Sequence, residues 1–299
     1  MILPRIKLGV GEKVKDAVVL LHIARNKMMK RETFFLKFSD SGNVGDVISH
    51  YLYERISGKK APLNVGYVNR FRQPNFMITG SILQFADEES VIWGTGFAKA
   101  GLGIGNKGWS SLKIKENKEK PRKICAVRGP LTRQCLMKKN IPCPAVFGDP
   151  ALLMPNFYNP PVPVKKYRLG VVAHFSYRES PNFFDLRNQS DVFFISVFDP
   201  PEKFVDQMLA CKFIASSSLH GLILADAYKL PSIWIQPADK ACVDTSFKFI
   251  DYMSTTDSIQ KEPLILTQET TQKDIVSFCR LRKSKVDLLE LLLSCPFIG

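Results

Sequence analysis

The sequence of 299 residues predicts an α/β protein made of two doubly wound domains that face a cleft. Short apolar runs alternate with helical stretches in both halves of the chain, a pattern typical of parallel sheets with helical crossovers. Prolines gather at residues 155–163, where they can neither extend a helix nor donate to a sheet, and this favours a linker. We therefore expect an N-terminal domain over residues 1–158 and a C-terminal domain over residues 159–299, whose last helix can pack back on the first domain.

The first half contains apolar runs that are short enough to be strands. Each run is followed by a loop with glycine or polar residues, so we expect these loops to line one edge of a parallel sheet. The expected strands are residues 33–37, 76–79, 91–93, 123–127 and 145–147.

The second half repeats this pattern after the prolines. Leucines spaced three and four apart near the C-terminus predict one long helix that packs by an apolar stripe. The expected strands are residues 168–173, 192–197, 212–215 and 232–235, and the expected helices are residues 202–210, 219–228 and 273–293.

The charge balance favours anionic partners, because 42 Lys and Arg against 28 Asp and Glu give a formal charge of +14. The basic residues are scattered, without an arginine-rich tail or zinc-finger spacing, so we expect no nucleic-acid partner. The seven cysteines form no Cys-x-x-Cys pair, which argues against a disulfide framework and favours a reducing compartment. No stretch has the ~20 apolar residues of a membrane span, and we expect a cytoplasmic protein.

Two segments suggest peripheral functions. Residues 17–31 combine an apolar run with basic residues. They fit either a helix that covers the core or a basic amphipathic helix that lies on the inner face of a membrane. Residues 101–120 are rich in Gly, Lys and Ser and are interpreted as a long loop that could act as a lid.

The polar turn at residues 216–221 (Ser-Ser-Ser-Leu-His-Gly) is the most informative stretch for function. A strand is expected before it and a helix after it, so His220 lies at the carboxyl edge of the sheet, where ligands bind in open α/β folds. The free N–H groups of the helix N-terminus attract anions there. His174 and Arg178 follow the first strand of the second half and reach the same edge. A histidine can act as acid or base near neutral pH, although a lone histidine is more often structural.

Further polar residues follow strands in the first half. Asn43 and Asp46 lie in a Gly-Asn-Val-Gly-Asp turn and fit either a ligand-binding or a helix-capping role. Arg128 fits either a clamp for a carboxylate or phosphate, or an ion pair at the surface. Asp149 precedes a proline, where aspartate commonly forms turns, and a direct ligand contact is the alternative.

Ordered motifs span most of the chain, at residues 42–46 (GNVGD), 128–130 (RGP), 148–153 (GDPALL), 217–227 (SSLHGLILADA) and 247–252 (FKFIDY). Together they resemble the motifs of the polysaccharide pyruvyl transferases. The resemblance implies two Rossmann-like domains in an arrangement similar to the GT-B glycosyltransferases. It also implies that phosphoenolpyruvate and a sugar diol react to give a cyclic pyruvate ketal and phosphate, with no metal or other cofactor.

The resemblance further implies roles for single residues, with phosphoenolpyruvate on the second domain and the sugar on the first. His220 is then the general acid, and Asp46 is an acceptor contact and the base. Some relatives carry arginine where this chain has Ser218, which leaves open which cation holds the phosphate. The implied donor contacts are Ser217, Ser218, Leu219, His174, Arg178, Arg128 and Lys248, and the implied acceptor contacts are Asn43, Asp46 and Asp149.

Two other functions fit the same features. A GT-B glycosyltransferase that uses a nucleotide sugar would share the architecture, because a fold does not fix a function. A non-catalytic protein that binds glycans or membranes is the second alternative. The acceptor sugar is not specified by the sequence, and the basic composition is compatible with a glycan linked to a lipid diphosphate.

Overall fold

The computed structural model describes residues 20–21, 23, 34–38, 41–66, 69–101, 120–240 and 246–298. Most of the helix expected over residues 17–31 lies outside these ranges, as does the loop expected over residues 101–120 apart from its two ends. Within the described ranges, none of the helices combines the length and the apolar character needed to cross a bilayer.

The first half forms a sheet of four parallel strands that lie in chain order. The strands are β1 (Phe35–Leu36), β2 (Asn75–Met77), β3 (Ser90–Trp93) and β4 (Lys123–Ala126). The helical segments are α2 (Val44–Ser57), η1 (Leu83–Phe85), α3 (Pro130–Met137), η2 (Pro150–Leu153) and α4 (Met154–Phe157). Pro130 is the first residue of α3, a position that suits its fixed φ and its missing N–H.

The second half forms a sheet of five parallel strands in the order β6-β5-β7-β8-β9. These are β5 (Tyr167–Val172), β6 (Val192–Phe194), β7 (Cys211–Ser216), β8 (Ser232–Pro237) and β9 (Leu264–Leu266). The strand order reverses between β5 and β7, so these neighbouring strands flank the switch point at which open α/β sheets bind ligands outside the carboxyl ends.

Helices cover both faces of this second sheet. Leu169 and Val171 pack with Leu186 and Ile275 in one apolar cluster, whereas Val172 belongs to the other cluster. This alternation follows from the period-two geometry of a strand. The helical segments are η3 (Pro181–Phe183), α5 (Phe184–Arg187), α6 (Pro201–Leu209), α7 (Leu219–Ala227), η4 (Ala238–Lys240), α8 (Ser246–Met253), α9 (Gln272–Phe278) and α10 (Leu288–Leu293).

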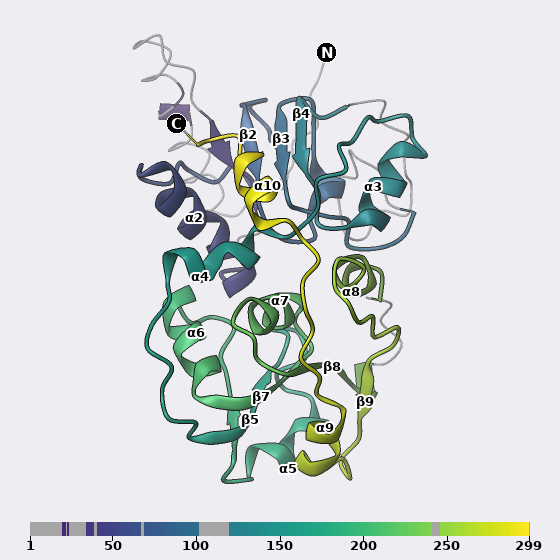
Figure 1. Cartoon of the computed structure of the whole chain (residues 1–299). Coiled ribbons are helices and arrows are strands. Elements are labelled where there is room, and N and C mark those ends of the chain that lie inside the picture. The colour runs from purple at the N-terminus through teal and green to yellow at the C-terminus, as the bar shows by residue number, and fades with distance from the viewer. Residues whose placement is uncertain are drawn as a thin grey trace.

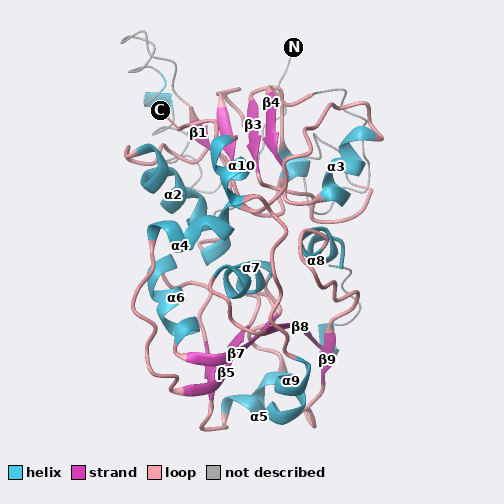
Figure 2. Cartoon of the chain, in the orientation of Figure 1, coloured by secondary structure: helices cyan, strands magenta, loops and turns pink. Residues whose placement is uncertain are grey.

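The two sheets lie at opposite ends of the molecule, with α4, α7 and α8 between them (Figures 1 and 2). Residues 219–226 of α7 are all buried, as expected for a helix that is apolar all round and covered on every side. One apolar cluster runs through both halves and contains Leu36, Trp93 and Leu222. The α/β class predicted from the sequence is therefore confirmed, whereas the boundary near residue 158 stays a prediction.

Two predicted elements differ from the structure, and one observed strand is missing from the prediction. Residues 145–147 form an isolated bridge between Phe147 and Val127 rather than a strand. The prediction lacks the three-residue strand β9. The single helix expected over residues 273–293 is instead α9 and α10, with an extended segment between them.

Arg282 explains why the expected long helix is broken. Its Nε donates to Asp226 Oδ2 (3.0 Å), and its Nη2 donates to Ser232 Oγ (2.6 Å). The neighbouring backbone pairs with β8, since Ser232 N donates to Arg280 O (2.9 Å). A leucine spacing cannot reveal these long-range partners. Beyond this segment α10 packs on the first sheet, where Trp93 Nε1 donates to Leu291 O (2.9 Å; α10 is yellow in Figure 1).

Candidate active site

The carboxyl ends of β5 and β7 meet at the switch point of the second sheet. Ser217 N donates to Val172 O (3.0 Å), and the Ser217 hydroxyl accepts a hydrogen bond from His174 N (2.8 Å). These two bonds join the loops that follow the strands. The sequence placed Ser217 and His174 at one edge, and the structure brings them into contact there.

The N-terminus of α7 receives no capping hydrogen bond from the side chain of its own N-cap residue. Ser218 occupies the N-cap position, but its hydroxyl makes no capping hydrogen bond. Ser216 Oγ instead accepts from Ser218 N (3.1 Å), and a Cβ on Gly221 would lie 2.2 Å from this oxygen. Glycine at 221 therefore lets the serine turn fold tightly under the helix. The free N–H groups of the first turn, with Leu219 at its start, form a place where an anion is favoured.

His220 faces Asp149 across the boundary between the two halves. His220 Nε2 lies 3.6 Å from Asp149 Oδ2, and neither buried atom has a hydrogen-bond partner among the described residues. The other carboxylate oxygen accepts from Ala151 N (3.0 Å), which caps η2. Asp149 is fully buried and faces His220, and the acceptor contact predicted for it stays a prediction.

The first turn of α2 presses against the same imidazole. A Cβ on Gly45 would lie 2.2 Å from His220 Nδ1. Asn43 caps α2, since its Oδ1 accepts from Gly45 N (2.9 Å). Val44 N donates to Val197 O (2.6 Å), which ties this turn to the loop after β6. The glycine-rich turn is thus placed against the histidine of the second half.

Asp46 belongs to a polar network at this turn. Its Oδ2 accepts from Asn43 Nδ2 (2.7 Å) and from the Ser41 hydroxyl. Asp46 also stands in the first turn of α2, where a carboxylate is stabilised by the helix dipole. The ligand-binding and capping roles predicted for Asn43 and Asp46 are therefore compatible, because Asn43 caps the helix and orients the carboxylate.

Lys248 brings a cation to the donor side. Burial and the charge of Arg128 lower the pKa of Lys248 to about 8. Burial and the charge of Lys248 in turn lower the pKa of His174 to about 3, so this imidazole is neutral at pH 7. Among the described residues no acid pairs with Lys248, whose Nζ lies 5.3 Å from the centroid of the Phe249 ring. An unpaired, partly desolvated cation is suited to an anionic ligand.

Arg128 lies in the interior rather than at an open edge. Its Nε donates to Asp251 Oδ2 (2.9 Å), and its Nη1 and Nη2 donate to Ser81 Oγ and Phe97 O (both 2.7 Å). Its side chain is fully buried, which rules out the surface ion pair, and the predicted clamp for the donor stays a prediction. The sequence reasoning passed over Asp251, although an acid inside the apolar run at residues 247–252 signals a buried partner.

Arg178 lies at the rim of the site. Its Nε lies 3.1 Å from Glu179 Oε1, and its guanidinium carbon lies 5.8 Å from the centroid of the Phe198 ring. The side chain is 57% exposed, so the ion pair is weak in water. Arg178 therefore keeps its charge available at the rim.

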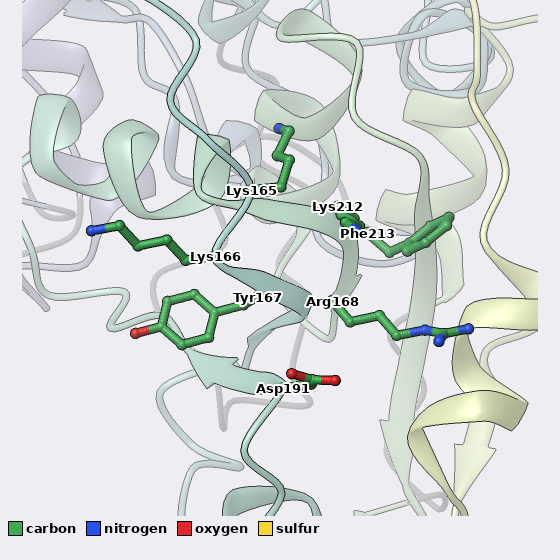
Figure 3. Close-up of a pocket in the computed structure, with 7 residues that line it drawn as sticks. All are labelled: Lys165, Lys166, Tyr167, Arg168, Asp191, Lys212 and Phe213. Carbon is green, nitrogen blue, oxygen red and sulfur yellow. The ribbon is translucent and has the colours of Figure 1, made fainter.

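A hollow of about 360 Å³ lies at the opposite edge of the second sheet, where β5 and β7 begin (Figure 3). Four cations line it with one acid and two aromatic residues, and Figure 3 shows Lys166 and Arg168 pointing to opposite sides. The lining residues are Lys165, Lys166, Arg168, Lys212, Asp191, Tyr167 and Phe213. Cations that diverge do not clamp one small anion. We therefore assign the candidate active site to the carboxyl edge, where donors and titratable groups converge.

These features define an α/β protein in which polar and titratable side chains converge at a sheet switch point. The chain matches the family model described as polysaccharide pyruvyl transferase over residues 43–239, and it belongs to that family. It is thus a transferase of a family that acts in pyruvyl transfer to polysaccharides, with a saccharide as acceptor.

The matched range contains the predicted site residues on both halves, from Asn43 to His220, whereas Lys248 lies beyond it. The chain is also 26% identical over 262 residues to the uncharacterized protein L143 of Acanthamoeba polyphaga mimivirus, which covers 83% of this chain and 84% of that protein. No solved structure matches the chain significantly.

Proposed function

We propose that the protein transfers the pyruvyl group of phosphoenolpyruvate to two hydroxyls of a sugar, forming a cyclic ketal and releasing phosphate. The observation that carries this proposal is the cluster at the switch point. Lys248 pairs with no acid among the described residues, and its charge acts on His174. The N-terminus of α7, whose N-cap side chain makes no capping bond, carries His220, which faces Asp149. Anion-binding groups next to a paired histidine are what a phosphorylated enol substrate requires.

The proposed reaction forms one C–H bond and two C–O bonds. It breaks one C–O bond, the π bond of the enol and the O–H bonds of two sugar hydroxyls. An acid gives a proton to the methylene carbon of phosphoenolpyruvate, which becomes a methyl group. Two sugar hydroxyls bond to the central carbon and lose their protons, and phosphate leaves with the electron pair of the broken bond. One hydroxyl proton restores the acid, and the other passes to phosphate or solvent.

His220 is the proposed acid in this scheme. Its side chain is 10% exposed and is held between Gly45 and Asp149, so its orientation is fixed before the substrate binds. A fixed proton donor is more effective than a mobile one, because the geometry need not be reorganised in the transition state. Asp46 is the proposed base for a sugar hydroxyl, with Asn43 beside it as an acceptor contact.

The donor contacts follow from charge. Lys248 and the first turn of α7 are proposed to bind the phosphate and carboxylate, with Ser217 and Ser218 in the turn. His174 contributes a hydrogen bond rather than a charge, since its pKa of about 3 keeps it neutral. Lys248 is thus the proposed cation for the phosphate, since this chain has Ser218 at the position where some relatives carry arginine.

Mass spectrometry tests the proposal directly. The protein is incubated with phosphoenolpyruvate and a panel of p-nitrophenyl hexosides, lipid-linked sugars and nucleotide sugars. A ketal mass on one acceptor with matching phosphate release supports it, and His220→Ala should lose both. Transfer of a hexose from a nucleotide sugar would instead establish the glycosyltransferase alternative. For Asp46→Asn, an unchanged rate at every acceptor concentration would restrict Asp46 to its structural role.

We also propose that the natural acceptor is linked to a lipid diphosphate and that the protein works at a membrane face. The divergent cations of the hollow at the amino edge support this, because an extended anionic surface satisfies side chains that point apart. Val162 and Val164 stand exposed just before them in the chain. Sedimentation with phosphatidylglycerol vesicles at low salt is the test, and absence of binding would count against the idea.

A further inference from the structure

Two exposed phenylalanines stand at the carboxyl edge of the second sheet, and the pyruvyl transfer scheme gives them no role. Phe175 and Phe198 are 41% and 44% exposed. Val171 of β5 pairs with Phe194 of β6. Phe175 is the fourth residue after Val171, and Phe198 is the fourth residue after Phe194. Adjacent strands lie about 4.8 Å apart, so the loops that carry the two rings leave the sheet side by side.

Both loops are held by backbone hydrogen bonds. Tyr177 N donates to His174 O (2.8 Å), which closes a tight turn around Phe175. Phe198 N donates to Ser196 Oγ (3.2 Å), and the preceding residue, Val197, accepts from Val44 N (2.6 Å). The two rings therefore project from turns that hydrogen bonds hold in place, and they are exposed in this fixed conformation.

The two rings border both sides of the candidate active site. The Phe175 ring lies 4.4 Å from the His174 ring, centroid to centroid, at an angle of 32°. Phe198 follows the residue that binds the first turn of α2, where Asn43 and Asp46 lie. Arg178 lies over the outer face of this region, 5.8 Å from the Phe198 centroid. We call Phe175, Phe198 and Arg178 the aromatic rim.

Exposed aromatic rings beside a catalytic site fit a saccharide better than the other substrate. A pyranose ring has a face of C–H groups that stacks on an aromatic ring, whose face carries partial negative charge. Its hydroxyls at the edge accept hydrogen bonds from a guanidinium. Phosphoenolpyruvate is small and anionic and gains nothing from the negative face of an aromatic ring. Fixed, exposed aromatic groups next to a polar site are typical of ligand-binding grooves.

We propose that the aromatic rim is the acceptor-binding subsite, in which Phe175 and Phe198 stack on sugar rings and Arg178 binds their oxygens. This inference rests on the proposed pyruvyl transfer and names where its acceptor binds. It assigns Arg178 to the acceptor rather than to phosphoenolpyruvate.

Steady-state kinetics of rim variants test the subsite. The acceptor is the p-nitrophenyl hexoside that releases most phosphate with the unmodified protein. We expect Phe198→Ala and Phe175→Ala each to raise the KM for this acceptor roughly three- to tenfold, while the KM for phosphoenolpyruvate is unchanged. Phe198→Trp should restore the acceptor KM, because an indole also stacks. Phe278→Ala is the matched control, since Phe278 is 51% exposed in α9, far from α2 in Figure 1.

The outcomes separate this subsite from the proposed reaction. Unchanged acceptor KM values in both alanine variants, with phosphate still released, would overturn the subsite and leave pyruvyl transfer standing. Loss of affinity for phosphoenolpyruvate in the same variants would also overturn it. If no acceptor supports phosphate release, the reaction fails, and saturation-transfer NMR from aromatic protons to methyl hexosides decides the subsite alone. A signal that disappears in Phe175→Ala/Phe198→Ala would support it, and an absent or unchanged signal would refute it.

Discussion

Asp149 Oδ2 and His220 Nε2 face each other at 3.6 Å, and each is buried without a hydrogen-bond partner among the described residues. This separation is longer than a hydrogen bond, so a small movement is enough to close it. The pair joins the loop before η2 to the first turn of α7, and therefore spans the two halves of the chain. Such a carboxylate would hold the protonated form of His220 until the ring gives its proton to the substrate.

We expect Asp149→Asn to lower kcat at least about tenfold, with little change in the KM for phosphoenolpyruvate. Asparagine keeps the Oδ1 that caps η2 but removes the charge that faces His220. Asp287→Asn is a control, since Asp287 caps α10 in the same manner. A kcat within twofold of the unmodified protein would show that Asp149 acts only in the cap.

The lowered pKa of Lys248 leads us to expect that donor binding weakens as the pH rises. Its pKa of about 8 means that the free protein loses this charge as the pH rises through 8. We expect the KM for phosphoenolpyruvate to rise between pH 7 and pH 9 and to approach a tenfold increase per pH unit at the upper end. Lys248→Arg should flatten this profile, because arginine stays charged throughout. A rise of equal size in Lys248→Arg would mean that another group titrates.

His174 predicts a loss of stability in mild acid. Its folded pKa of about 3 lies below its ordinary value of 6.5, so between these values the unfolded chain binds a proton that the folded chain excludes. The free energy of unfolding is therefore unaffected above pH 6.5 and falls as the pH drops towards 3. At pH 5 the difference reaches up to about 2 kcal/mol. Urea unfolding at pH 7 and pH 5 should show a smaller decrease for His174→Gln, and equal decreases would contradict the assignment.

Arg128 and Asp251 are expected to stabilise the fold rather than bind the donor. Asp251 also accepts from Thr132 N (2.8 Å) and Thr132 Oγ1 (2.7 Å), so it ties α8 to the start of α3. Removing one partner leaves a buried charge, and we expect Asp251→Ala to lower the free energy of unfolding by about 3–5 kcal/mol. Arg128→Met/Asp251→Leu should lose less than the sum of the single changes. If the double variant folds but its KM for phosphoenolpyruvate is strongly raised, Arg128 binds the donor after all.

The sequence predicts those parts of the site that depend on local pattern. His174, Ser217 and His220 each follow an apolar run, and parallel strands bring such ends to one edge. The prediction fails where a partner is distant along the chain. Asp226 and Arg282 are separated by 56 residues, and their pairing breaks a helix that leucine spacing predicts. Burial of Arg128 has the same origin, because its partner Asp251 lies 123 residues away.

Contacts between the halves are also invisible to pattern analysis. A turn rich in glycine suggests tight backbone geometry or a nearby ligand, and residues 42–46 allow both readings. The structure shows a third reason for Gly45, since the imidazole of His220 occupies the space that a Cβ would take. Only the packing of α2 against α7 reveals it.

Gly45→Ala separates catalytic geometry from stability at this contact. Alanine is a better helix former than glycine by about 1 kcal/mol, so in an open position the change would stabilise α2. Here the new Cβ would lie 2.2 Å from His220 Nδ1, closer than any van der Waals contact, and the ring must move. We expect kcat to fall at least about tenfold while the protein stays folded by circular dichroism. Val47→Ala, in the same helix, should leave kcat unchanged. An unchanged kcat in Gly45→Ala would show that His220 can shift without loss and would remove it as the oriented acid.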